Sequence, residues 1–222
     1  MRIASLSLLA LCLTLAALPA VAQCPGGDCY DNGPANGQVD AWTINFGFTV
    51  SDSFHLSGPT DIESISFYAW LIPGDTVSNV EVQLGNEAFG NEILDTVANM
   101  TQSNCFANNF GYNVCQESGS LPNTLLQGGN YWVTLGNATV PSGDPVYWDE
   151  NSGVGCTSPG CPSSAQENTV GTIPSEAFTL DGQAATTSTS TSTSGTTPEP
   201  SSIMLFGSGI LGLAGLLRRK LF

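Results

Sequence analysis

Apolar and polar side chains alternate along several short segments of this chain, and this period of two constrains the fold more than any other feature. Between Trp42 and Val50, apolar residues occupy every second position, with Thr, Asn and Gly between them. The same alternation recurs in residues 65–71, 80–84, 131–135 and 178–180. A period of two is typical of a β-strand with one buried face. Only the region around Glu92 to Met100 has a pattern compatible with a short helix.

Turn-forming residues separate the alternating segments, for example at Asn32-Gly33, Pro73-Gly74 and Gly128-Gly129. Short strands divided by turns predict an all-β body at residues 23–183, a single β-sandwich with a jelly-roll-like arrangement. A body of this length can bury a core of its own. Residues 184–197 form a Ser/Thr-rich linker whose composition cannot bury apolar surface, so we expect it to act as a flexible spacer.

The first 22 residues have the three parts of a secretory signal peptide. Met1 and Arg2 supply a positive start, residues 3–18 are apolar, and Ala20-Val21-Ala22 is a small-residue cleavage site. The mature chain is therefore expected to begin at Gln23. Because Gln23 is not a small residue, we do not expect lipid attachment at the cysteine that follows it.

Six cysteines remain after the signal peptide is removed, and they form three local pairs. The pairs are Cys24 with Cys29, Cys105 with Cys115, and Cys156 with Cys161. Six cysteines allow fifteen connectivities, among which sequence alone does not choose. Turns inside two of the pairs and the oxidising setting of an exported protein favour disulfides between neighbours. The alternative is a zinc site built from the two C-x4-C pairs.

The last 25 residues have three features in a fixed order. Pro198, Glu199 and Pro200 come first, an apolar run at residues 203–217 follows, and Arg218, Arg219 and Lys220 come directly after it. Seventeen residues, 201–217, are just long enough to span a hydrocarbon core. The basic cluster is expected to stay cytoplasmic, which leaves the Pro-Glu-Pro triplet and the body outside.

This tail resembles the PEP-CTERM sorting sequence of Gram-negative bacteria, on the residues just named, although Thr197 stands where that family often has Val. The resemblance implies recognition of the triplet by a membrane-embedded exosortase. It also implies an inner-membrane stage followed by release to the cell surface or to an exopolysaccharide matrix. Similar tails occur on unrelated extracellular proteins, some of them ice-binding or adhesive. The alternatives are an ordinary C-terminal anchor or a GPI-like tail.

The charge distribution of the body excludes several kinds of partner. All four Lys and Arg residues lie in the two targeting segments, whereas every acidic residue except Glu199 lies in the body. Nucleic-acid binding requires cations that neutralise phosphates, so it is excluded, as is adhesion to anionic membranes. Most of the carboxylates are expected only to keep the domain soluble.

No arrangement of residues predicts catalysis. His55 is the only histidine, and it lies in an alternating Phe-His-Leu context that is typical of an outward-facing strand residue. Asp149 and Glu150 are the one pair of carboxylates that suggests a glycoside hydrolase, but neighbours on a strand point to opposite faces. We therefore expect a protein that is not an enzyme and requires no cofactor.

One stretch combines aromatic with polar side chains, as sugar-binding surfaces do: Tyr147, Trp148, Asp149, Glu150 and Asn151. Residues 125–135 and 145–148 resemble the turn-and-strand of carbohydrate-binding-type jelly rolls, which implies glycan binding by analogy of fold. An exopolysaccharide would then be a partner. Two alternatives remain open: Trp148 belongs to the core, or the domain is a structural, ice-binding or adhesive matrix protein without a discrete ligand site.

Acidic and amide residues also gather near the mature N-terminus, where Asp28, Asp31, Asn32, Asn36 and Asp40 form an oxygen-rich loop. Hard cations prefer oxygen ligands, so these residues are candidates for a structural calcium site, although the spacing is not that of an EF-hand. Residues 144–151, beginning at Asp144, are the second candidate. The alternative is that the loops use these residues for turns.

Overall fold

The structure is a computed structural model that describes Cys24 and residues 28–185. The predicted signal peptide, sorting motif and apolar C-terminal run lie outside these residues. The described part of the chain consists of β-strands joined by turns and loops, and it contains no helix long and apolar enough to cross a membrane.

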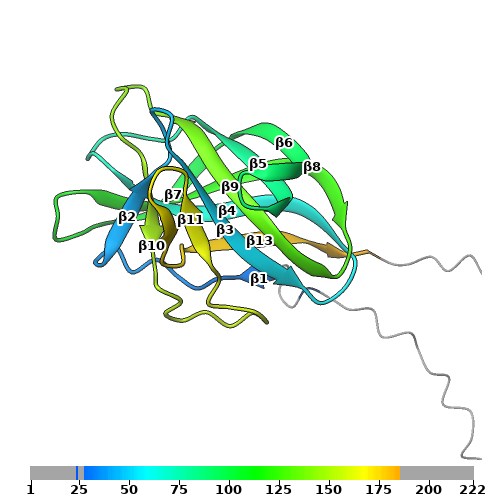
Figure 1. The fold of residues 1–222 in the computed structure, drawn as a ribbon. Coiled ribbons are helices and arrows are strands. Elements are labelled where there is room, and N and C mark those ends of the chain that lie inside the picture. The colour runs from blue at the N-terminus through cyan, green and yellow to red at the C-terminus, as the bar shows by residue number, and fades with distance from the viewer. Residues whose placement is uncertain (1–23, 25–27, 186–222) are drawn as a thin grey trace, which may run out of the picture. The chain divides into compact units, whose positions relative to one another are not determined.

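The strands form two antiparallel sheets, which confirms the all-β prediction (Figure 1). The seven-stranded sheet has β1, β13, β4, β10 and β2 side by side, while β8 pairs with β4 on another path and β7 pairs with β8. Its strands are β1 (Asp28–Asp31), β13 (Phe178–Ala184), β4 (Thr60–Leu71), β10 (Tyr147–Glu150), β2 (Asp40–Thr43), β8 (Asn113–Leu126) and β7 (Thr101–Ala107). The first and last strands of the body pair with each other.

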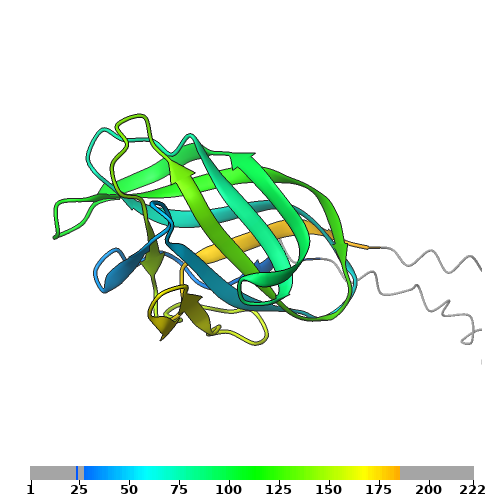
Figure 2. The same ribbon diagram turned by 45° about the horizontal axis from the view of Figure 1, so that its top comes forward.

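The six-stranded sheet has the order β12, β11, β3, β9, β5, β6, and Figure 2 shows its long strands running beside one another. Its strands are β12 (Gly171–Ile173), β11 (Ala165–Glu167), β3 (Thr49–Leu56), β9 (Gly129–Thr139), β5 (Asn79–Glu87) and β6 (Gly90–Asn99). The jelly-roll arrangement stays a prediction.

The core lies between the sheets and follows from the alternation within each strand. On β4, Ile65, Phe67 and Ala69 are fully buried, whereas Ser66 and Tyr68 between them are partly exposed. Successive side chains on a strand point to opposite faces, so each strand directs one set inward. Trp148 of β10 is fully buried against Phe67 and Phe178, with ring centroids 6.1 and 5.7 Å away. Burial of such large aromatic surfaces stabilises the sandwich.

Two expectations about local structure were wrong. Residues 42–50 are not one half-buried strand, because the chain turns between β2 and β3: Phe46 and Gly47 have positive φ values of 58° and 88°, and Phe48 N–H donates to Asn45 O at 3.0 Å. The Phe46 side chain is 63% exposed. Residues 92–100 belong mainly to β6 and not to a helix, because their backbone pairs with β5.

Three disulfides join neighbouring cysteines, the pairing that their spacing favours. They link Cys24 with Cys29, Cys105 with Cys115, and Cys156 with Cys161. Each closes a short loop, so by the chain-entropy estimate each contributes about 2 to 3 kcal/mol. The disulfides therefore act as local clamps on a fold that depends on its core.

Candidate functional site

The predicted sugar-binding stretch lies on β10 and just beyond it, and its side chains do not share one face. Tyr147 is partly exposed on the outer face of the seven-stranded sheet. Trp148 faces the core and donates from Nε1 to Ala177 O at 2.9 Å, so it is unavailable to a ligand. Glu150 and Asn151 are also buried. Of the five residues, only Tyr147 offers an accessible aromatic face.

Asp149 is buried beneath the outer surface and holds a loop in place. Its carboxylate accepts hydrogen bonds from Trp70 Nε1, from Asn36 N at 3.0 Å and from Gly37 N at 3.0 Å. Burial raises the pKa of Asp149 to about 6, and these three donors oppose that rise. Because all of its partners are protein groups, Asp149 positions Trp70 and the 36–37 loop and does not reach solvent.

Glu150 points to the opposite face from Asp149, as expected for neighbours on a strand. Its carboxylate accepts from Trp42 Nε1 at 3.3 Å and from Ser152 Oγ at 2.8 Å. Asn151 caps the next turn, with Nδ2 donating to Asn32 O at 2.6 Å and Oδ1 accepting from Gly153 N at 2.8 Å. The Asp149–Glu150 pair therefore cannot act together on one substrate.

Tyr147 instead belongs to a small cleft whose walls come from segments far apart in the sequence. We name it the aromatic cleft. Its volume is about 240 Å³. It is lined by Val39, Asp40, Ala41, Trp70, Phe110, Tyr112 and Tyr147. Strand pairing explains the assembly, because Tyr147 of β10 is in register with Trp70 of β4.

The four aromatic rings of the cleft contact one another in sequence. Phe110 stacks on Trp70 with centroids 5.5 Å apart and planes 18° from parallel. Tyr112 lies 5.8 Å from Trp70 and meets Tyr147 edge to face at 5.6 Å. Burial raises the pKa of Tyr147, and the neighbouring Tyr112 hydroxyl adds to the rise. Phe110 is 58% exposed, so the cleft offers a supported aromatic face to solvent.

The loop that carries Phe110 and Tyr112 is held by its own polar groups. Asn108 Oδ1 accepts from Phe110 N at 3.0 Å and from Tyr112 N at 2.9 Å, an arrangement typical of an Asx turn. The Cys105–Cys115 disulfide closes the β7–β8 hairpin behind the loop. The exposed ring is therefore positioned before any ligand arrives.

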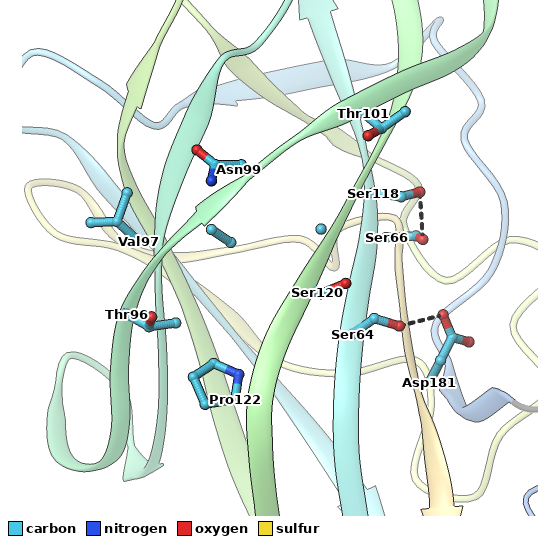
Figure 3. Close-up of a pocket in the computed structure, with 12 residues that line it drawn as sticks. Ser64, Ser66, Thr96, Val97, Asn99, Thr101, Ser118, Ser120, Pro122 and Asp181 are labelled. Atoms are coloured by element: carbon cyan, nitrogen blue, oxygen red, sulfur yellow. Dashed lines mark hydrogen bonds between the residues drawn. The ribbon is translucent and has the colours of Figure 1, made fainter.

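A second depression, which we name the hydroxyl groove, is lined by β6 of the six-stranded sheet and by strands of the seven-stranded sheet (Figure 3). Its volume is about 730 Å³, and small polar residues from β4, β6, β7, β8 and β13 form most of its lining. Ser66 and Ser118 Oγ are 2.8 Å apart, and Ser64 Oγ donates to Asp181 Oδ2 at 3.1 Å. These three hydroxyls therefore already have hydrogen-bond partners, and no aromatic ring lines the groove.

Among the described side chains, the candidate calcium ligands Asp31, Asp40 and Asp144 do not form one cluster. Asp31 Oδ1 accepts from Gly33 N and Asp40 Oδ1 from Ala41 N, each at 2.8 Å, so both carboxylates serve local turns. Asp28 lies in β1, whereas Asp144 lies in the loop before β10. Within the described residues, no group of three or more His, Cys, Asp or Glu side chains is arranged to hold a metal ion.

His55 lies on β3, where its ring is hydrogen-bonded to Asn130 Oδ1 at 2.8 Å on the neighbouring strand. That arrangement is typical of a cross-strand pair on a sheet face. No serine or cysteine nucleophile bonds to it among the hydrogen bonds of the described residues.

Sequence reasoning missed Trp70, Phe110 and Tyr112. Phe110 and Tyr112 lie in the segment between Cys105 and Cys115, which carries three aromatic residues in a loop of Asn and Gly. Aromatic residues in a polar loop between two paired cysteines were the sequence signal that could have indicated this site. Trp70 could not be linked to them without knowing the strand pairing.

Comparison with known families settles the nature of the C-terminal tail. A family model described as the PEP-CTERM protein-sorting motif matches residues 196–220. The chain is a PEP-CTERM domain-containing protein. The motif implies that this PEP-CTERM protein is exported and sorted by an exosortase. A search of curated proteins finds no match to the chain.

Proposed function

We propose that this PEP-CTERM protein is a non-catalytic glycan-binding protein of the cell surface or extracellular matrix of a Gram-negative bacterium. The aromatic cleft carries the proposal. In it, an exposed Phe110 ring rests on Trp70 beside the hydroxyls of Tyr112 and Tyr147. Sugar rings have apolar faces that pack on aromatic rings, and their hydroxyls bond to polar groups at the rim.

The size of the cleft suits a short part of a glycan. Its volume of about 240 Å³ is below the roughly 300 Å³ at which pockets for drug-sized ligands begin. We infer that it holds one sugar ring of a longer chain, which enters and leaves through the open side. The asparagine-held loop reduces the ordering that binding would otherwise require.

The charge of the body favours a neutral glycan. The formal net charge of the whole chain is −15, and its four basic residues all lie in the targeting segments. Asp40 adds a carboxylate at the cleft itself. An anionic polysaccharide would be repelled at low salt, so we infer that the preferred ligand is an uncharged sugar chain.

The absence of catalysis is part of the proposal. The two adjacent carboxylates of β10 point to opposite faces, and Asp149 is held by three protein donors. A glycosidase needs two carboxyl groups that flank the scissile bond from one cleft. The aromatic cleft contains one, Asp40.

Binding to an array of neutral and acidic glycans, measured with the exported protein, tests this proposal. Phe110→Ala and Tyr147→Ala should each weaken binding about tenfold, because a lost aromatic platform is worth about 1.4 kcal/mol. Phe46→Ala is the matched control, since Phe46 is 63% exposed and does not line the cleft. Equal affinity in all four proteins, or binding to no neutral glycan, would refute the proposal.

The hydroxyl groove favours a second function, adhesion of the sheet face to a hydroxylated surface such as a polysaccharide or ice. Its hydroxyls occupy matched positions on neighbouring strands, with Ser66 opposite Ser118 and Ser64 opposite Ser120. Ser64, Ser66 and Ser118 already have hydrogen-bond partners, so fewer hydroxyls of the groove can bind a ligand. Ser118→Leu should abolish adhesion by this face, and unchanged adsorption of that variant would exclude it.

A further inference from the structure

Two acidic side chains enter the space between the sheets, where no basic residue is present to neutralise them. Asp52 of β3 alternates with buried Val50 and Phe54, so it faces the core. Glu176 forms a β-bridge with Glu150, which shares the inward face of β10 with Trp148. Both acids are fully buried. The backbone of Glu176 lies directly beside the Asp52 carboxylate, because Glu176 N donates to Asp52 Oδ2 at 2.8 Å.

Three carboxylate oxygens of this pair have no hydrogen-bond partner in the described structure: Asp52 Oδ1, Glu176 Oε1 and Glu176 Oε2. Burial without a partner is costly for a charged group and also for a polar one. Protonation would remove the charge but leave the same oxygens without partners. A bound cation would satisfy both requirements, and the described residues contain no Lys or Arg.

The surroundings of the pair are rich in further oxygens. Asn32 Nδ2 lies within 3.4 Å of Asp52 Oδ2, within 2.7 Å of both Ser163 Oγ and Ser175 Oγ, and within 2.6 Å of Glu176 O. Four oxygens therefore surround an amide group that has two hydrogens. Hard cations take hydroxyl, carbonyl and carboxylate oxygens in this kind of mixture.

We propose that the carboxylates of Asp52 and Glu176, with the hydroxyl oxygens of Ser163 and Ser175 and the backbone carbonyl oxygen of Glu176, form a buried calcium site that locks the two sheets together. Calcium tolerates an irregular shell of six to eight oxygens, whereas Mg²⁺ demands near-octahedral geometry. The proposed site contains two carboxylates, so it is not a group of three or more His, Cys, Asp or Glu side chains, of which the described residues contain none arranged to hold a metal ion. It is separate from the loop carboxylates of Asp31 and Asp40 and from the aromatic cleft.

The electrostatics of the pair agree with this geometry. Burial raises the pKa of Asp52 to about 7. Burial raises the pKa of Glu176 well above its usual range, and the nearby carboxylates of Asp52, Glu150, Asp149 and Asp40 add to the rise.

Melting of the exported protein at pH 8, in EGTA, in millimolar calcium and in sodium at matched ionic strength, tests the site. We expect calcium alone to raise the melting midpoint by about 5 °C. One calcium should remain bound per chain after desalting. Terbium in its place should luminesce through Tyr30, whose hydroxyl donates to Asn32 Oδ1 at 3.1 Å.

Asp52→Asn and Glu176→Gln should each remove the calcium shift and the terbium signal. Glu117→Gln is the matched control, because Glu117 is another buried carboxylate without a hydrogen-bond partner and should leave both readouts unchanged. A calcium shift that persists in Asp52→Asn would place the cation elsewhere and overturn the proposal. Equal midpoints in calcium and sodium for the unmodified protein would overturn it without any variant.

Discussion

Replacing Glu117 with Gln should make this protein more stable at neutral pH but not at acidic pH. Glu117 lies on β8 opposite Phe67 of β4 and Gln102 of β7, and its side chain is fully buried. Neither carboxylate oxygen has a hydrogen-bond partner among the described residues. Burial raises the pKa of Glu117 from 4.5 to about 8. The folded protein therefore keeps a proton that the unfolded chain loses.

The sign and size of the effect follow from that difference. Because the folded pKa is raised, the contribution of Glu117 to stability is fully present below pH 4.5 and is lost as the pH rises to about 8. Each pH unit in this window costs about 1.4 kcal/mol, so the cost at pH 7 is about 3 kcal/mol. Gln does not titrate and avoids this loss.

Urea unfolding at pH 4.5, 6, 7 and 8.5 measures the effect. The free energy of unfolding of Glu117→Gln, relative to the unmodified protein, should rise by about 3 kcal/mol between pH 4.5 and 7 and level off above pH 8. Other buried acids titrate equally in both proteins and cancel in the comparison. Glu92→Gln is the control, because Glu92 is exposed on β6. A difference between the two proteins that does not change with pH would refute the reasoning.

Three further predictions concern a turn, a disulfide and the chain ends. Gly153→Ala should destabilise the fold by about 2 kcal/mol or more, because φ is +75° and the new Cβ would clash with Pro162 Cβ. Gly111→Ala, at φ +88° in open space, should destabilise it by only about 1 kcal/mol. Equal melting midpoints for the two variants would contradict this prediction. The double substitution of Cys105 and Cys115 by Ser should lower the free energy of unfolding by about 2.5 kcal/mol. It should also weaken glycan binding, because the loop that carries Phe110 is no longer held by the disulfide. An unchanged urea midpoint and an unchanged affinity would contradict this role of the disulfide. The intact mass of surface material should fit a start at Gln23 and an end near Pro198, and a mature chain that retains residues 218–222 would argue against exosortase processing.

The all-β class and most of the inward faces could be predicted because alternation reports them directly. The segments 65–71, 80–84, 131–135 and 178–180 all lie in strands. The prediction of one strand at residues 42–50 was wrong because Phe46 has a left-handed turn conformation. That conformation is uncommon for a bulky residue, and the alternation of apolar and polar residues does not reveal it. Ile93 and Val97 are four apart, as on a helix, yet both are exposed on β6.

The candidate sites could be predicted only in part, because each depends on long-range strand pairing. Alternation places Tyr147 and Trp148 on opposite faces but does not say which face is the core. Trp70 meets Tyr147 only through the β4–β10 register. Asp52 and Glu117 carry a signal in hindsight: each is an acidic residue at an inward position of a strand, where an apolar side chain is expected.

NMR chemical-shift changes caused by a neutral oligosaccharide in the exported protein test whether the aromatic cleft is the glycan site. Binding in the aromatic cleft should produce concentration-dependent shifts confined to residues 39–41, 108–112 and 147 together with the indole of Trp70, which line or support the cleft. Shifts concentrated instead at Ser64, Ser66, Ser118 and Ser120, or no shifts with any neutral glycan, would contradict it.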